Sequence, residues 1–133
     1  MRAIIMGASK LGITMAGLLE KEGHKITLID IDPDALNHLP QTYQGEKITG
    51  SGTDPELLKK IGLSKDDAFI AATTSDNVNI AAIKMVKEQF GCQKTGKVIH
   101  DPLRAKAFNE VEKGIICPIL DAAMRFNTQI MSA

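Results

Sequence analysis

The stretch IIMGASKLGITMAGLLEKEGHKITLID, residues 4–30, decides the fold of this chain. Its apolar, β-branched start predicts a strand over residues 2–6, and Gly7 follows where that strand must turn. Apolar side chains then recur at helical spacing over residues 11–22, and Gly23 ends the pattern. The last six residues, KITLID, predict a second strand. The stretch is therefore a β-α-β unit with two parallel strands.

The same alternation continues along the rest of the chain. Further strands are predicted at residues 46–50, 68–73, 97–101 and 115–117, and further helices from 33, at 54–62, 75–91, 103–114 and 119–131. We see no internal repeat and no linker. The pattern predicts one α/β domain over residues 1–133, with a doubly wound, mainly parallel six-stranded Rossmann-like sheet in the order 3-2-1-4-5-6.

The composition excludes several classes of protein. Hydrophobic residues make up 44% of the 133 residues and charged residues 24%, so a disordered chain is not expected. The 16 basic and 16 acidic side chains balance, and with one Tyr and no Trp there is no nucleic-acid surface. No apolar run approaches the about 18 residues of a membrane span, and the start does not have the order of a signal peptide. We expect a cytoplasmic protein; peripheral docking at the inner face of the membrane stays open.

The cysteines and histidines do not predict a metal site. Cys92 and Cys117 lie far apart without a C-x-x-C partner, and His24, His38 and His100 show no ligand spacing with them. We expect two free thiols in a reducing compartment and no metal.

The loop GASKLG has nearly the G-x-G-x-x-G pattern that binds dinucleotide phosphates. Gly7 suits the tight turn, Gly12 lets the helix approach the sheet, and the free N–H groups of the helix start favour an anion. Ser9 replaces the middle glycine, but its hydroxyl is able to bond a phosphate oxygen, and Lys10 adds a positive charge. The alternative for this loop is a purely structural turn.

Asp30 closes the second predicted strand, 23 residues after Gly7. A carboxylate in this place accepts hydrogen bonds from a ribose diol and repels a 2′-phosphate, which favours NAD over NADP. The alternative is an ordinary acid at a strand end. Asp32, two residues later, fits a helix N-cap as well as a place in the site.

Hydroxyl-rich turns follow the third and fourth predicted strands. Ser51, Gly52 and Thr53 either line an adenine pocket or turn the chain. Thr73 and Thr74 stand where a parallel strand beside the first one ends, so they are candidates for contacts with pyrophosphate or a second nucleoside. Thr74 or Ser75 is also a natural N-cap for the helix that follows.

Binding without chemistry is favoured over catalysis. A hydride-transfer enzyme needs a substrate region and an acid or base beside the nicotinamide, whereas the predicted nucleotide fold uses nearly all of this chain. His100, at the end of the fifth predicted strand, fits a polar turn better than a catalytic role, and there is no G-x-x-x-x-G-K-[ST] loop. The alternative is the cofactor-binding domain of a small NAD-dependent oxidoreductase.

The closing helix, about residues 118–131, carries an apolar stripe after the sheet is complete. The stripe consists of Leu120, Ala123, Met124, Asn127, Ile130 and Met131. It packs either on its own domain or on another subunit.

Three segments together resemble one known family, the TrkA-N or KTN domains of Trk/Ktr-type potassium transport, which are the N-terminal subdomains of regulators of potassium conductance (RCK). They are MGASKLGITMAGLLEKEGHKITLIDIDP (6–33), TGSGTDPELLKKIG (49–62) and DAFIAATTSDNVNIAAIKMVKEQFG (67–91). The resemblance covers about 115 residues. It implies phosphate contacts of NAD(H), ATP, ADP or AMP at Gly7, Ala8, Ser9, Lys10, Leu11 and Gly12, ribose contacts at Asp30, adenine contacts at Ile31, Ser51, Gly52 and Thr53, and further contacts at Thr73 and Thr74.

The resemblance also implies a biological role. Such domains are not enzymes; they form homodimers, often further rings, and their ligand-dependent hinge motions act on a membrane-embedded potassium transporter or channel. Three positions depart from the family pattern: Ser9 replaces the second glycine, Lys10 stands where arginine is common, and Val98 stands where members often carry an arginine in the fifth strand. The companion C-terminal ligand subdomain has no counterpart in these 133 residues, which fits a stand-alone subunit or a domain of a longer protein.

Overall fold

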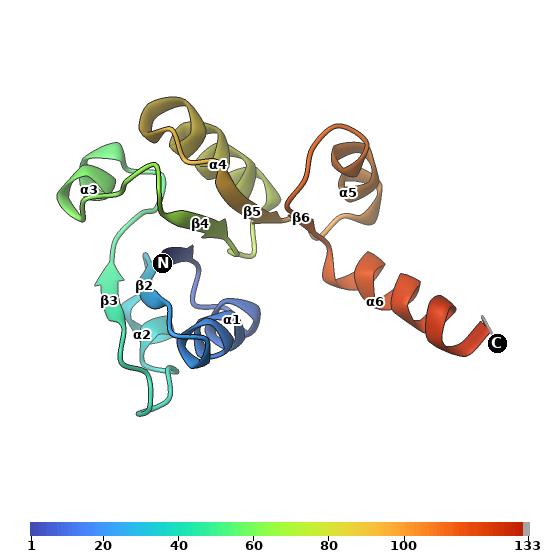
Figure 1. Cartoon of the computed structure of the whole chain (residues 1–133), viewed down its shortest axis with the longest axis horizontal. Coiled ribbons are helices and arrows are strands. Elements are labelled where there is room, and N and C mark those ends of the chain that lie inside the picture. Colours follow the sequence, from blue (N-terminus) through green and yellow to red (C-terminus); the bar gives the residue numbers. More distant parts are fainter. Residues whose placement is uncertain (132–133) are drawn as a thin grey trace.

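Six parallel strands form one sheet in the order β3-β2-β1-β4-β5-β6, which confirms the predicted topology (Figure 1). The structure, a computed structural model, describes residues 1–131. The strands are β1 (Arg2–Met6), β2 (Lys25–Asp30), β3 (Glu46–Thr49), β4 (Ala68–Ala71), β5 (Lys94–Val98) and β6 (Ile115–Ile116). The helices are α1 (Lys10–Lys21), α2 (Pro33–Leu36), α3 (Pro55–Lys60), α4 (Asp76–Phe90), α5 (Pro102–Asn109) and α6 (Pro118–Phe126), followed by the π-helical turn η1 (Asn127–Met131).

The core lies on both faces of the sheet because its central strands are apolar on both sides. Successive side chains of a strand point to opposite faces. Ile4 therefore joins the cluster under α3 and α4, and Ile5 joins the cluster under α1 and α2. Figure 1 shows these two helix pairs on opposite sides of the sheet. This covering of both faces is typical of a parallel sheet.

Most helices begin at a polar side chain that accepts a backbone N–H of the first turn. These N-caps are Ser9, Asp32, Asp54, Ser75 and Asp101. A proline follows each of the three aspartates in the first turn of its helix. Proline fits there because the backbone N–H that it lacks would have no acceptor within the helix. The predicted cap roles of Asp32 and Ser75 are thus confirmed.

Two element bounds predicted from the sequence are wrong. Strand β5 runs over Lys94–Val98 instead of 97–101, because its polar first half pairs with β4. It ends early since the N–H groups of His100 and Asp101 turn to the carboxylate of Asp76. Helix α5 ends at Asn109, well before Gly114, whose φ of +80° returns the chain to the sheet at β6.

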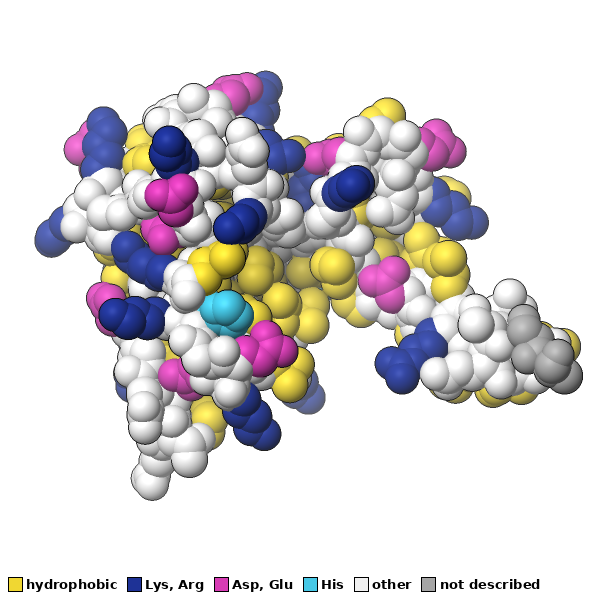
Figure 2. All heavy atoms as spheres, viewed as in Figure 1, with side chains coloured by type: hydrophobic (Ala, Val, Ile, Leu, Met, Phe, Trp, Pro, Cys, Tyr) yellow, Lys and Arg dark blue, Asp and Glu magenta, His cyan; other side chains and the backbone are white. Residues whose placement is uncertain are grey.

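Helix α6 projects away from the sheet (Figure 1), and none of its residues is buried. Leu120 near its start still touches the small core cluster beside α5. Beyond it, the apolar side chains of Met124, Phe126 and Ile130 are 60–67% exposed. Figure 2 shows hydrophobic side chains along one edge of this projecting arm. The predicted helix is present, and beyond Leu120 its stripe does not pack on the chain's own sheet.

Candidate functional site

A hollow of about 470 Å³ opens at the carboxyl ends of β1, β2 and β4, and most of the predicted residues line it. They are Gly7, Ala8, Ser9, Asp30, Ile31, Asp32, Ser51, Gly52, Thr53, Thr73 and Thr74. The chain leaves β1 toward one face of the sheet and β4 toward the other, which is where ligands bind in open parallel sheets. Lys10, Leu11 and Gly12, also predicted for the site, begin α1 just behind the lining.

Glycine is required at two positions of the first loop. Gly7 has a φ of +111°, and a Cβ there would lie 2.6 Å from the carbonyl oxygen of Ala72 at the end of β4. A Cβ on Gly12 would collide with the carbonyl oxygen of Gly7. The loop therefore holds α1 close to the sheet, with the start of the helix facing the hollow.

Ser9 uses its hydroxyl inside the protein. The hydroxyl donates to the carbonyl oxygen of Ala72 (2.9 Å) and accepts the N–H of Gly12 (3.1 Å). The one proton of this hydroxyl is therefore already donated within the protein, which opposes the predicted contact with a phosphate oxygen. Within residues 1–131, no acceptor takes the N–H groups of the N-cap Ser9 and of Lys10 and Leu11, the first two residues of α1. These three donors are available to an anion.

The carboxylate of Asp30 lies against the glycine loop. Oδ2 accepts the N–H of Ala8 at 2.8 Å, and Oδ1 accepts the N–H of Asp32 at 2.9 Å. Each oxygen retains further lone-pair capacity toward the hollow, because a carboxylate has about four acceptor sites. Asp32 itself caps α2 through the N–H of Asp34 at 2.9 Å. Beside them the side chain of Ile31 is 74% exposed, so it offers an apolar surface to a flat ring.

The turn after β3 is also held by internal bonds. The hydroxyls of Ser51 and Thr53 bond each other at 2.7 Å, and the Ser51 hydroxyl also accepts the N–H of Thr53. Gly52 is buried, and a Cβ there would collide with the sulfur of Met6. A side chain at position 52 would push this turn out of place at the hollow.

The turn after β4 depends on Asn79, a residue that the sequence analysis missed. Asn79 is fully buried on α4 and bonds both the backbone and the hydroxyl of Thr73. Thr74 is exposed at the hollow, and Ser75 caps α4. The available signal was an amide among the apolar side chains Val78, Ala82 and Val86 of the helix predicted over residues 75–91.

Asp76 joins this turn to the end of β5. Burial alone would raise the pKa of Asp76, but the N–H groups of His100 and Asp101, with the nearby charges of His100 and Arg104, hold it below the ordinary value. His100 Nε2 lies 3.1 Å from the carbonyl oxygen of Thr73. His100 is thus part of a polar turn, in line with the role favoured from the sequence.

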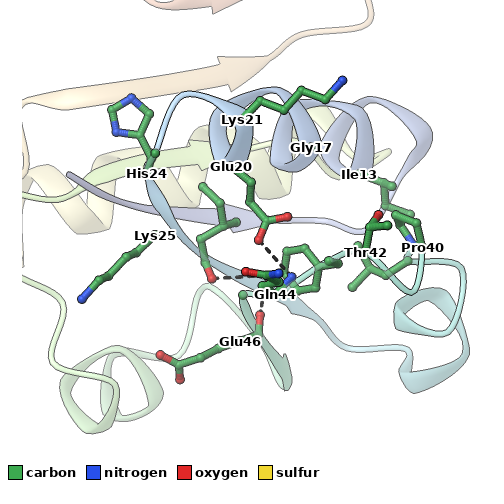
Figure 3. Close-up of a pocket in the computed structure, with 15 residues that line it drawn as sticks. Ile13, Gly17, Glu20, Lys21, His24, Lys25, Pro40, Thr42, Gln44 and Glu46 are labelled. Atoms are coloured by element: carbon green, nitrogen blue, oxygen red, sulfur yellow. Dashed lines mark hydrogen bonds between the residues drawn. The ribbon is translucent and has the colours of Figure 1, made fainter.

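A second hollow, of about 700 Å³, lies at the opposite edge of the sheet between the end of α1 and residues 39–46 (Figure 3). Its cations do not converge: Figure 3 shows Lys21, His24 and Lys25 pointing in different directions. Glu20 is engaged with the N–H of Gln44 at 3.0 Å. The hollow also faces the carboxyl end of α1, where the helix dipole opposes an anion. It does not fit a phosphate ligand.

Two further observations limit the chemistry of the described residues. Residues 1–131 contain no group of three His, Cys, Asp or Glu side chains arranged to hold a metal ion, and Cys92 and Cys117 are buried free thiols. In the same part of the chain, no helix has the length and apolar character needed to cross a bilayer.

The sequence matches the TrkA-N domain family over residues 3–118. This chain belongs to the TrkA-N domain family. Two curated relatives agree with the match, and both are Trk system potassium uptake proteins. TrkA of Streptomyces coelicolor is 34% identical over 111 residues, 84% of this chain and 50% of that protein. The Pyrococcus abyssi TrkA homolog is 34% identical over 113 residues, which are 85% of this chain and 50% of that protein. This TrkA-N domain therefore spans about half the length of the curated relatives it matches.

Solved structures share the fold of this TrkA-N domain at low sequence identity. The Shewanella denitrificans Kef CTD in its AMP-bound form superposes with a TM-score of 0.74 at 16% identity, over 99% of this chain and 80% of that one. The GsuK channel bound to NAD superposes with a TM-score of 0.69 at 19% identity, over 88% of this chain and 21% of that one. At these identities the likeness shows the fold alone.

Proposed function

We propose that this TrkA-N domain binds NAD(H) or an adenine nucleotide (ATP, ADP or AMP) and thereby regulates a membrane-embedded potassium transporter or channel. One observation carries the proposal. The loop Gly7–Ser9, which leads into the N-terminus of α1, and Asp30 line one hollow at the carboxyl edge of the sheet, and the Asp30 carboxylate bonds that loop at the N–H of Ala8. The curated relatives are potassium uptake proteins, and solved neighbours of the same fold are bound to AMP and NAD.

Each part of an adenine nucleotide finds a suitable group in the hollow. The phosphates lie at the start of α1, where the free N–H groups, the helix dipole and Lys10 all favour negative charge. The ribose hydroxyls donate to the Asp30 carboxylate. The adenine ring rests against Ile31 and the turn at Ser51–Thr53. Thr74 faces the remaining phosphate or second nucleoside.

The exposed arm supports assembly into a homodimer. Ile119, Met124, Phe126, Ile130 and Met131 are each at least 60% exposed on α6 and η1. Burying such side chains against a second copy removes apolar surface from water. The nucleotide then acts by binding one arrangement of the dimer more tightly than the other, since a ligand shifts an equilibrium only by its differential affinity. The dimer, or a ring built from it, would act at the inner face of the membrane.

The alternative is the cofactor-binding domain of an NAD-dependent oxidoreductase. The fold does not separate the two, because one fold hosts many functions. The relatives favour regulation, since they are potassium uptake proteins. His100, the candidate acid or base of the alternative, is engaged in a turn with the carbonyl of Thr73. We therefore propose a binding domain without catalysis.

Calorimetric titration with NAD⁺, NADH, NADPH, AMP, ADP and ATP tests the proposal. We expect binding of NAD(H) or adenine nucleotides and weaker binding of NADPH, because its 2′-phosphate approaches the Asp30 carboxylate. In Asp30→Asn, affinity for the preferred nucleotide should fall by about tenfold, because a charge-assisted hydrogen bond is lost. The difference in affinity between this nucleotide and NADPH should become smaller. Asp66→Asn, which changes an exposed acid outside the hollow, is the matched control. Failure of every nucleotide to bind at millimolar concentration would refute the proposal.

A further inference from the structure

The amide of Asn79 is the most completely bonded buried polar group in the described chain. Its side chain is fully excluded from solvent. Oδ1 accepts the N–H of Thr73 at 3.0 Å and the hydroxyl of Thr73 at 2.6 Å. Nδ2 donates to the carbonyl oxygens of Thr73 at 3.1 Å and Val98 at 2.8 Å. Both donors and both acceptor sites of the amide are therefore used.

These four bonds span the point where two neighbouring strands separate. The pairing of β4 with β5 ends at Ala71 and Lys97. Beyond it, Thr73 turns toward α4, and Val98 is the last residue of β5. The Asn79 amide binds both segments, so it takes the place of the hydrogen bonds that the sheet no longer supplies. The shape of the turn after β4 is thus fixed from below by one side chain.

The same bonds give the two threonines of the hollow different roles. Every polar atom of Thr73 has a partner inside the protein, because its hydroxyl also accepts the N–H of Ser75 at 3.2 Å and its carbonyl also meets His100. Thr74 is exposed at the hollow. Fixing Thr73 consequently positions Thr74 and Ser75, which line the hollow, beside the space where a ligand would lie.

We propose that Asn79 is the positioning residue of the nucleotide cleft, holding the Thr73–Ser75 wall in the geometry that binds the ligand. This inference rests on the proposed function. Asn79 does not line the hollow itself, so its effect on the ligand is transmitted through Thr73. A preorganised wall binds more tightly, since the ligand does not have to order it.

The test compares Asn79→Ala with Val86→Ala. Val86 is also fully buried on α4, but it lies two turns further along, in the core cluster under β4, and touches no part of the hollow. Both substitutions lower stability, so loss of stability alone does not distinguish them. Titrations with ADP and NAD⁺ are done at a temperature where circular dichroism shows both variants fully folded. We expect Asn79→Ala to weaken binding by about tenfold, and Val86→Ala by less than about twofold.

Hydrogen exchange provides a second readout that does not need the ligand. In Asn79→Ala the amides of residues 72–78 should exchange faster relative to those at the end of α4, whereas Val86→Ala should show the reverse pattern. If Asn79→Ala does not fold, Asn79→Asp replaces it, because aspartate keeps the size and the acceptor oxygen but loses both N–H donors. We expect weaker nucleotide binding and faster exchange over residues 72–78 in this variant too.

Two results would overturn the inference. One is equal nucleotide affinity in the Asn79 and Val86 variants. The other is unchanged exchange over residues 72–78 in the Asn79 variant. If the unmodified protein binds no nucleotide, the proposed function fails, and the exchange experiment still decides whether Asn79 holds this wall.

Discussion

Substitution of Ser9 separates the role that the sequence suggests for this residue from the role that the structure shows. The glycine-loop pattern assigns the Ser9 hydroxyl to a phosphate. In the structure the same hydroxyl caps α1 and ties the loop to the carbonyl oxygen of Ala72. We therefore expect Ser9→Ala to reduce stability and to leave nucleotide affinity nearly unchanged.

The magnitude follows from the two bonds that are lost. Loss of a serine N-cap costs about 1 kcal/mol, and loss of an ordinary hydrogen bond to a carbonyl costs about 1 kcal/mol more. The free energy of unfolding should fall by about 2 kcal/mol, which lowers the Tm of a domain of this size by roughly 8 °C. Ser75→Ala is the matched control: Ser75 caps α4 through the N–H of Val78, so its loss should cost about 1 kcal/mol.

Urea unfolding and calorimetric titration on the same preparations measure the two effects. We expect the dissociation constant of the preferred nucleotide to change by less than about twofold in Ser9→Ala, because the free N–H groups of Lys10 and Leu11 are retained. A variant with unchanged stability and about tenfold weaker binding would show that the hydroxyl holds the phosphate after all, and the reasoning from the structure would be wrong.

Two further predictions concern acid stability and assembly. The pKa values of Asp76 and Glu112 are both lowered although burial opposes this, Asp76 by the N–H groups of His100 and Asp101 and Glu112 by the ammonium of Lys97. An acid with a lowered pKa stabilises the fold above its unfolded pKa, so the free energy of unfolding should fall as the pH drops below about 4. This fall should be less steep in Asp76→Asn. Equal pH dependence of urea unfolding in Asp76→Asn and the unmodified protein would contradict this. Removal of residues 118–133 should turn a dimer into a monomer by light scattering, and an unmodified protein that is already monomeric at high concentration would rule out the proposed homodimer.

The fold could be predicted from the sequence because its information is local and repeated. Each apolar strand is followed by a turn and a capped helix, and the order of strands follows from right-handed connections. Strand β5 was placed wrongly because its first residues, Lys94–Gly96, carry no apolar pattern, and only pairing with β4 makes them a strand. The early end of α5 likewise depends on a tertiary contact, since Gly114 lies against Thr95 of β5.

The positions of the candidate site were predictable, but the partners of its side chains were not. Parallel strands bring their carboxyl ends to one edge, so residues after β1, β2, β3 and β4 had to meet there. Which hydroxyl faces outward depends on contacts between segments far apart in the chain. Ser9 bonds Ala72 across 63 positions, and Thr73 is held by Asn79, whose position in an apolar helix stripe indicates burial but not the segment that it bonds.

The internal bonding of these hydroxyls determines how the cleft is able to recognise a ligand. Four hydroxyls at the cleft form hydrogen bonds with neighbouring protein atoms, those of Ser9, Ser51, Thr53 and Thr73. In the proposed function, recognition therefore rests on the backbone N–H groups at the start of α1, the charge of Asp30 and the exposed Thr74. N–H groups bind any phosphate, so they supply affinity with little preference among nucleotides. We expect discrimination to come mainly from Asp30, which would accept an unmodified ribose and oppose a 2′-phosphate, while Lys10 would offer phosphates a single point charge. A cleft built in this way would accept several adenine nucleotides and select among them mainly by charge.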